Sequence, residues 1–290
     1  MSKSRSQYAA LNIASSFVGY FINTVVGFVC RMVFVRCLTE DHLGVAGLFT
    51  SIILMLSLSE LGLGAVMTHA LYDPIAKKDQ EKIAALIRYF AKIHRAIFGF
   101  IVIAGLALVP FLDSFVNERP SIDESFTLIY LLFVFSSALS YLFGHYSLFL
   151  RASQKDYVIA AVTYTTTIIQ SCVQIIVLLY TKNYIHYLTI QIVFLVFQYG
   201  SIAHLVRRKN RYLYEGHENR ILSKQEKKNL FKNIWVLSLS RLSGFLVNGT
   251  DNIIIAKLVG IASVGLLSNY ILLIGTIDAL IRSFVSSIGG

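Results

Sequence analysis

Eight long apolar runs constrain what this chain can fold into. Each run has about the 20 mostly apolar residues that an α-helix needs to cross a membrane. No run alternates polar and apolar residues between turns, as the strands of a membrane β-barrel do. The sequence therefore predicts an all-α, polytopic membrane protein. Its predicted helices are Leu11–Val35, Leu43–Met67, Ile83–Leu112, Phe126–Leu150, Tyr157–Tyr180, Tyr187–Val206, Asn233–Leu258 and Val264–Phe284.

Composition excludes several classes of protein. Hydrophobic residues make up 56% of the 290 residues and charged residues 14%, against about 25% charged residues in soluble domains. A disordered chain, a collagen-like chain and an ordinary soluble enzyme are excluded. The cysteines Cys30, Cys37 and Cys172 show no C-x-x-C spacing, so no disulfide framework or metal site is predicted. Phosphate-loop, hydrolase and zinc-protease motifs are lacking, so we expect a non-enzymatic protein without a cofactor.

The net charge of +10 follows the predicted topology. Twenty of the 26 Lys and Arg residues fall on one side of the predicted membrane, and nine of them lie in the segment 207–232. Five fall on the other side, and Arg241 lies inside a predicted helix. Because cytoplasmic loops carry the excess of Lys and Arg, the N-terminus is predicted to be cytoplasmic. The positive charge is therefore assigned to the membrane, and no nucleic-acid partner is expected.

The basic segment divides the chain into unequal parts. Residues 1–206 are predicted to form a six-helix transmembrane lobe, 207–232 a cytoplasmic linker, and 233–290 the first two helices of a second lobe. A weak repeat crosses the linker at one constant offset in sequence number: Arg36 matches Lys257 and Gly44 matches Gly265. Asn12-Ile13 matches Asn233-Ile234 at the same offset. Parallel repeats are typical of transporters, so a fragment lacking at least four helices of the second lobe is expected.

Polar side chains recur on one face of several predicted helices. Residues four apart share a helix face, and lipid disfavours a polar face, so these faces are predicted to meet protein or water. Close packing of helices through small residues is the alternative. A shared hydrated cavity is the interpretation we favour for the amides and the charges. The predicted substrate-binding residues are Asn23, Arg31, Gln170, Gln174, Arg241 and Asn248.

The charges inside the predicted helices need partners. A charge at the bilayer centre costs at least about 2.5 kcal/mol on insertion scales. Arg31 has snorkelling to the outer headgroups as its alternative role. Arg241 and Asp251 are too far apart on one helix to pair with each other. Each therefore needs a partner on another helix, water or a substrate, and a coupling cation at Asp251 is the hypothesis we add for that acid.

Several segments resemble those of a known family. They are the Asn-Ile start at Asn12, Arg36–Gly44, Leu48-Phe49, Leu58–Ala65 (LSELGLGA), Ala70–Ala76 (ALYDPIA) and the stretch Lys77–Lys82. With the six helices, basic linker and repeated start, they resemble the Wzx-type capsule and O-antigen flippases. These belong to the multidrug/oligosaccharidyl-lipid/polysaccharide exporter superfamily. The resemblance implies alternating-access transport of an undecaprenyl-diphosphate-linked oligosaccharide from the inner to the outer leaflet of a bacterial cell membrane.

The resemblance also implies partners for the protein, and it leaves alternative functions open. Membrane lipids and the polysaccharide polymerase or export machinery are the implied partners. A cation-coupled multidrug exporter of the same superfamily would favour an acidic, aromatic cavity. A polymerase or glycosyltransferase would need a large outer loop, and the predicted outer loops 113–125 and 181–186 are short. A non-transporting membrane fragment is the remaining alternative.

Overall fold

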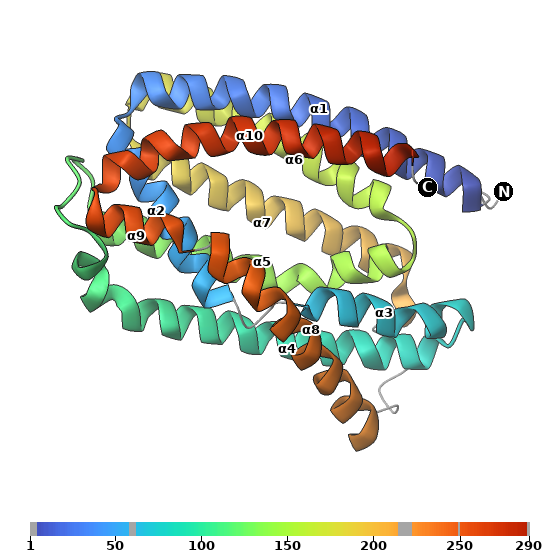
Figure 1. Cartoon of the computed structure of the whole chain (residues 1–290). Helices are drawn as coiled ribbons and strands as arrows, with labels where there is room; N and C mark the ends of the chain where they lie inside the picture. Colours follow the sequence, from blue (N-terminus) through green and yellow to red (C-terminus); the bar gives the residue numbers. More distant parts are fainter. Residues whose placement is uncertain (1–4, 58–61, 214–221, 249, 289–290) are drawn as a thin grey trace.

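The computed structural model is an elongated bundle of helices (Figure 1). It describes residues 5–57, 62–213, 222–248 and 250–288, and side chains at 21–57, 62–213, 222–238 and 250–278. Its described residues contain helices and no strand, as an all-α membrane protein requires. The helices are α1 (Arg5–Cys37), α2 (Glu40–Leu56), α3 (Leu63–Ala76), α4 (Gln80–Leu108), η2 (Val109–Phe115), α5 (Phe126–Ala152), α6 (Asp156–Thr181), α7 (Tyr184–Lys209), η3 (Arg211–Leu213), α8 (Lys224–Asn248), α9 (Asp251–Leu258) and α10 (Ile261–Ile288).

Five helical segments among the described residues are long and apolar enough to cross a membrane. They are Gln80–Phe115, Phe126–Ala152, Asp156–Thr181, Tyr184–Lys209 and Ile261–Asp278. Each coincides with one predicted span. Helix α1 matches the first predicted span, and its side chains are described from residue 21 onward. The chain is therefore a polytopic membrane protein built from helices.

Two of the predicted helices are wrong as single elements. The run Leu43–Met67 is divided into α2, which ends at Leu56, and α3, which begins at Leu63. Gly62 precedes α3 with a φ of 89°, a left-handed conformation that glycine adopts without the steric cost of a Cβ. The run Asn233–Leu258 is divided into α8 and α9.

Helical residues extend into both ends of the predicted linker 207–232. Helix α7 continues to Lys209, and α8 begins at Lys224. Lys, Gln and Glu open α8, and these residues favour helix even in a strongly charged segment. Residues 214–221 lie outside the described part of the chain.

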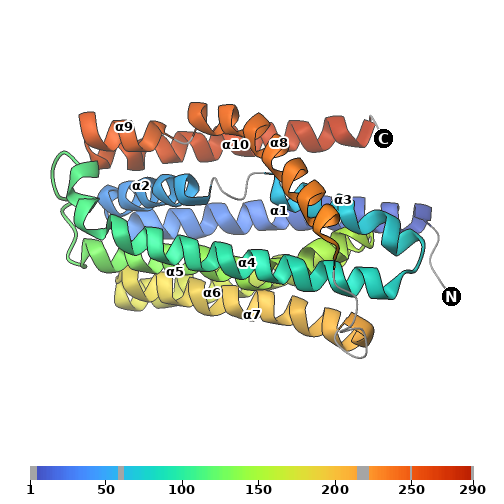
Figure 2. The same ribbon diagram turned by 90° about the horizontal axis from the view of Figure 1, so that it is seen from below.

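Helix α2 packs against α10, α9, α5 and α4. Val45, Leu48 and Phe49 are fully buried, and α10 runs along the same helix (Figure 2). The two helices approach closely at Gly44 and Gly265: a Cβ on Gly265 would lie 3.0 Å from the Gly44 nitrogen and closer still to the Glu40 carbonyl. In a membrane, where lipid is as apolar as the side chains, such small residues permit the close packing that holds helices together.

Gly44 and Gly265 are equivalent positions of the weak sequence repeat, and their separation in sequence is here called the repeat offset. The same offset relates the turn before α2 to the turn before α10. At that offset the end of α1 at Cys37 corresponds to the end of α9 at Leu258. The start of α2 at Glu40 corresponds in the same way to the start of α10 at Ile261. Equivalent residues of the two repeats therefore lie at the same helix boundaries, and the two repeated helices contact each other at equivalent glycines.

Candidate functional site

A cavity of about 510 Å³ lies between α1, α2, α6, α7 and α10. Four of the predicted substrate-binding residues line it: Asn23, Arg31, Gln170 and Gln174. They come from α1 and α6, which pack against each other. The polar faces predicted on these two helices therefore meet at one space inside the bundle.

Arg31 is the only charged residue in the lining of this cavity, as far as the described side chains define it. Its Nη2 donates a hydrogen bond to the hydroxyl of Ser268, and its Nε donates to Asn269 Oδ1 at 2.9 Å. Both acceptors are neutral and both lie on α10. No carboxylate among the described residues forms an ion pair with Arg31. The cavity thus holds a positive charge that these residues do not neutralise.

Amide and hydroxyl side chains make up the rest of its polar wall. Gln174 is 2% exposed and donates through Nε2 to the Tyr187 carbonyl at 3.1 Å. Gln170 donates to Gln174 Oε1 at 3.3 Å. The side-chain oxygen of Asn23 is buried and has no hydrogen-bond partner among the described residues. Leaving a buried acceptor unpaired costs about 1–3 kcal/mol, and a donor from a ligand in the cavity would remove that cost.

Aromatic rings close one end of the cavity. Tyr184 and Tyr187, on the first turn of α7, line the cavity and pack edge-on against Phe34 of α1 with ring centroids 5.5 and 5.3 Å apart. The Tyr187 hydroxyl lies 3.7 Å from the Cys30 sulfur. Aromatic rings present apolar faces and polar edges, which suits a passage for an amphiphilic solute.

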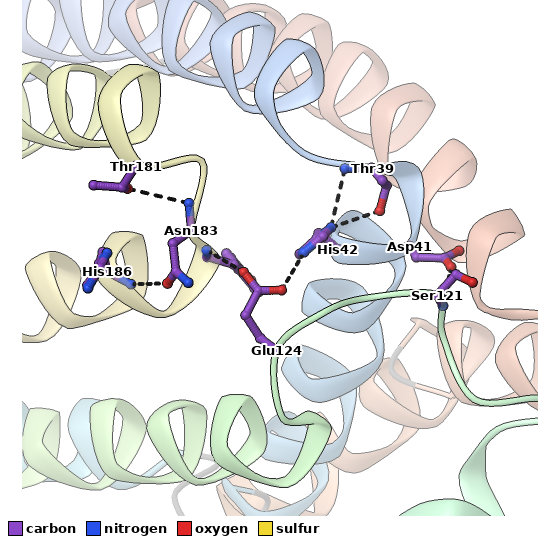
Figure 3. A network of polar contacts seen from close by, with 9 residues as sticks. Thr39, Asp41, His42, Ser121, Glu124, Thr181, Asn183 and His186 are labelled. Carbon is purple, nitrogen blue, oxygen red and sulfur yellow. Dashed lines mark hydrogen bonds and ion pairs between the residues drawn. The ribbon is translucent and has the colours of Figure 1, made fainter.

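A buried polar network fixes this aromatic end (Figure 3). The Glu124 side chain is 8% exposed; its Oε1 accepts the Tyr184 N–H at 2.8 Å and its Oε2 lies 3.0 Å from His42 Nε2. The Thr39 N–H donates to His42 Nδ1, so Nδ1 carries no proton and Nε2–H donates to Glu124. The network therefore ties α2, the loop before α5 and α7 together at the cavity.

The electrostatics of Glu124 follow from these contacts. Burial by itself raises the pKa of this carboxyl, but hydrogen bonds from the Tyr184 N–H and from His42 favour the charged form. The net result is a pKa below its ordinary value. Glu124 is thus held as a carboxylate whose two oxygens are both used by the protein.

Two further cavities extend the first along the bundle. One of about 260 Å³ shares Thr50, Phe133, Leu188 and Gln191 with it. Another of about 900 Å³ shares Ile53, Leu54 and Ser137 with the second and includes Arg151 and Asp156, at the turn between α5 and α6. The three cavities are therefore neighbours along the bundle, from the α6–α7 turn to the α5–α6 turn.

The remaining predicted site residues are not brought into this cavity by the described structure. Arg241 and Asn248 belong to α8, but their side chains lie outside the described residues. Asp251 is the first residue of α9 and is exposed.

Sequence reasoning missed Ser268 and Asn269, although two adjacent polar residues within an apolar run mark a helix position that faces protein.

The site is an amide-lined and aromatic cavity with one cation that no described carboxylate neutralises. Its function has to be inferred from these residues, because no family model, no curated protein and no solved structure matches the chain.

Proposed function

We propose that this protein is a membrane transporter that moves a lipid-linked oligosaccharide diphosphate from the inner to the outer leaflet of a bacterial cell membrane. The observation that carries the proposal is Arg31, whose positive charge faces a half-open cavity between the helices with no acidic partner among the described residues. A cation in an apolar bundle is costly unless an anion or water accompanies it. A diphosphate supplies that anion.

The chemistry of the cavity wall fits such a substrate. A guanidinium presents five N–H groups, and its planar fork binds phosphate oxygens in pairs. Two of these groups on Arg31 donate to α10, which leaves three for a ligand. The amides of Asn23, Gln170 and Gln174 border the same space and offer both donors and acceptors to sugar hydroxyls.

The neighbouring cavities support a path along the bundle. Alternating access requires a binding site that opens first to one side of the membrane and then to the other. The cavity with Arg31 lies toward the α6–α7 end, and the cavity with Arg151 lies at the opposite, basic end. With the N-terminus in the cytoplasm, the substrate enters from the basic end and leaves past the Tyr184 ring to the outer leaflet, where polysaccharide polymerase would receive it.

A cation-coupled drug exporter is the second candidate. It requires an acidic residue in the cavity, and none lines the described part of this one. Asp251 is exposed and lies outside the described cavity lining. Its role as the site of a coupling cation therefore rests on the sequence prediction alone. The anionic substrate is therefore the better match.

Transport in proteoliposomes tests the proposal. The purified protein is reconstituted with a fluorescent undecaprenyl-diphosphate oligosaccharide, and arrival of the sugar at the far leaflet is followed with a membrane-impermeant lectin. We expect transport by the wild type, a loss of about 10- to 100-fold in Arg31→Ala, and an intermediate rate in Arg31→Lys. A lysine keeps the charge but lacks the fork.

Gln198→Ala is the matched control, because Gln198 donates to Thr163 on the neighbouring helix and is absent from the described cavity lining. It should transport at the wild-type rate. Wild-type transport in Arg31→Ala, with equal protein in the vesicles, would show that Arg31 serves packing or snorkelling and not substrate binding.

A further inference from the structure

The contact between Arg31 and α10 has an equivalent in the other repeat. At the repeat offset Arg31 corresponds to Asn252 on α9, whose Nδ2 donates to the Gly47 carbonyl at 3.3 Å and to the Ser51 hydroxyl at 3.0 Å. Gly47 and Ser51 belong to α2. At the same offset Gly47 corresponds to Ser268, the partner of Arg31. Each donor therefore reaches from its own repeat to the equivalent position of the other repeat.

This reciprocity is what a two-fold relation produces. In a two-fold interface, if residue i contacts residue j, then the equivalent of j contacts the equivalent of i. The close contact of Gly44 with Gly265, which are equivalent positions of the two repeats, lies between α2 and α10, the two helices that receive these hydrogen bonds. The two repeats thus meet where α2 and α10 lie against each other (Figures 1 and 2). One polar contact lies on each side of this crossing.

The two contacts differ in charge and surroundings. Asn252 is neutral and does not line the described cavity, whereas Arg31 is charged and does. Ser268 and Asn269 hold Nη2 and Nε, along one edge of the guanidinium. The Nη1 group and the second hydrogen of Nη2 are left, and together they form the end-on fork that binds a phosphate through two oxygens. Ser268 also donates to the Gly265 carbonyl at 2.7 Å, so its own orientation is fixed at the crossing.

We propose that Ser268 and Asn269 are positioning residues of the anion site. Arg31 then binds a diphosphate with its highest affinity only while α10 of the second repeat is in contact with α1. The inference rests on the proposed function and adds its regulation. Because coupling is reciprocal, a bound diphosphate stabilises the α1–α10 contact, and separation of the repeats at this side releases the ligand. The Asn252 contact on the other side carries no ligand and is unaffected by it.

Binding of inorganic pyrophosphate to the full chain in nanodiscs, measured by calorimetry, tests this inference. Each of Ser268→Ala and Asn269→Ala removes one hydrogen bond to Arg31, and the dissociation constant should rise by about fivefold. Ser268→Thr retains the hydroxyl and should restore the wild-type value to within about twofold. Asn269→Asp should raise the constant by about 30-fold or more, because it still orients Arg31 but neutralises its charge. This variant tests whether the charge of Arg31 is needed, and the two alanine variants test the positioning role.

Asn252→Ala is the matched control, since it removes the equivalent contact of the other repeat without touching Arg31. Its dissociation constant should stay within about twofold of wild type. An equal rise in Asn252→Ala, or unchanged binding in both alanine variants of α10, would overturn the positioning role while leaving the anion site standing. Absence of pyrophosphate binding by the wild type, or full binding by Arg31→Ala, would instead remove the anion site and the inference with it.

Discussion

Two ionisable side chains near the cavity, Glu124 and Arg31, differ in how far the protein satisfies their hydrogen-bonding groups. Glu124 has both carboxylate oxygens occupied by the protein, through Tyr184 and His42. Among the described residues Arg31 has only neutral partners, and three of its N–H groups have no acceptor there. A carboxylate satisfied in this way serves structure, whereas a cation with spare donors beside a cavity is suited to a ligand. Glu124 therefore has a structural role, whereas Arg31 is the charged residue suited to bind a ligand.

Replacement of Glu124 by Gln tests the structural role. Because its pKa is held below the ordinary value, the carboxylate contributes stability above the ordinary carboxyl range, and this contribution is lost as pH falls through the lowered pKa. We expect Glu124→Gln to lower stability by about 1–3 kcal/mol at pH 7. Thermal unfolding in detergent, measured from pH 7 down to about pH 2, should show wild type and variant converging once the pH falls below the ordinary carboxyl range.

The neighbouring exposed acid Asp123 provides the control. Asp123→Asn should unfold like the wild type across the same pH range. A constant difference between wild type and Glu124→Gln at every pH would mean that shape, and not the charge of Glu124, stabilises this end of the cavity.

At the scale of elements, the α2–α10 crossing depends on two residues without side chains. A Cβ on Gly44 would overlap the Ile261 backbone, and one on Gly265 would meet the Glu40 carbonyl and the Gly44 nitrogen. Backbone atoms cannot rotate away as the end of a side chain can. The crossing therefore holds only while both positions are glycine.

Alanine at these positions gives a prediction with an internal control. Gly44→Ala and Gly265→Ala should each destabilise the protein by about 1–3 kcal/mol, because they overpack the crossing. Gly275→Ala lies on the same α10 with nothing within 4 Å of the new Cβ. It should be neutral or stabilising by up to about 1 kcal/mol, since alanine favours helix over glycine. Detergent unfolding curves of the three variants measure the difference, and equal losses at all three would argue against a close crossing.

On the scale of the whole molecule, the charge asymmetry predicts the orientation. The segment 207–232 carries nine Lys and Arg residues, and Ser223 beside α8 is exposed. A cysteine at Ser223, in a variant lacking the three native cysteines, should react with a membrane-impermeant maleimide only after the cells are permeabilised. A cysteine replacing exposed Ser121, in the loop at the opposite end, should react in intact cells. The reverse pattern would invert the orientation and the proposed direction of transport.

The sequence by itself determined the class of fold and much of the cavity. Apolar runs of membrane-spanning length favour helix because a helix satisfies every backbone hydrogen bond within one segment in lipid, and five of those runs are continuous spanning helices among the described residues. Polar residues four apart on α1 and α6 must turn away from lipid, so Asn23, Arg31, Gln170 and Gln174 were predictable as one group. Their shared orientation follows from helical periodicity alone.

The tertiary structure alone decided the breaks and the long-range partners. Hydropathy does not register a glycine at φ 89°, so the end of α2 and the start of α3 were hidden in one apolar run. The pairing of Arg31 with Asn269 joins residues 238 positions apart, and that of His42 with Glu124 joins residues 82 apart. Local patterns determine which face of a helix is polar, but only the packing of one helix against another determines what that face meets.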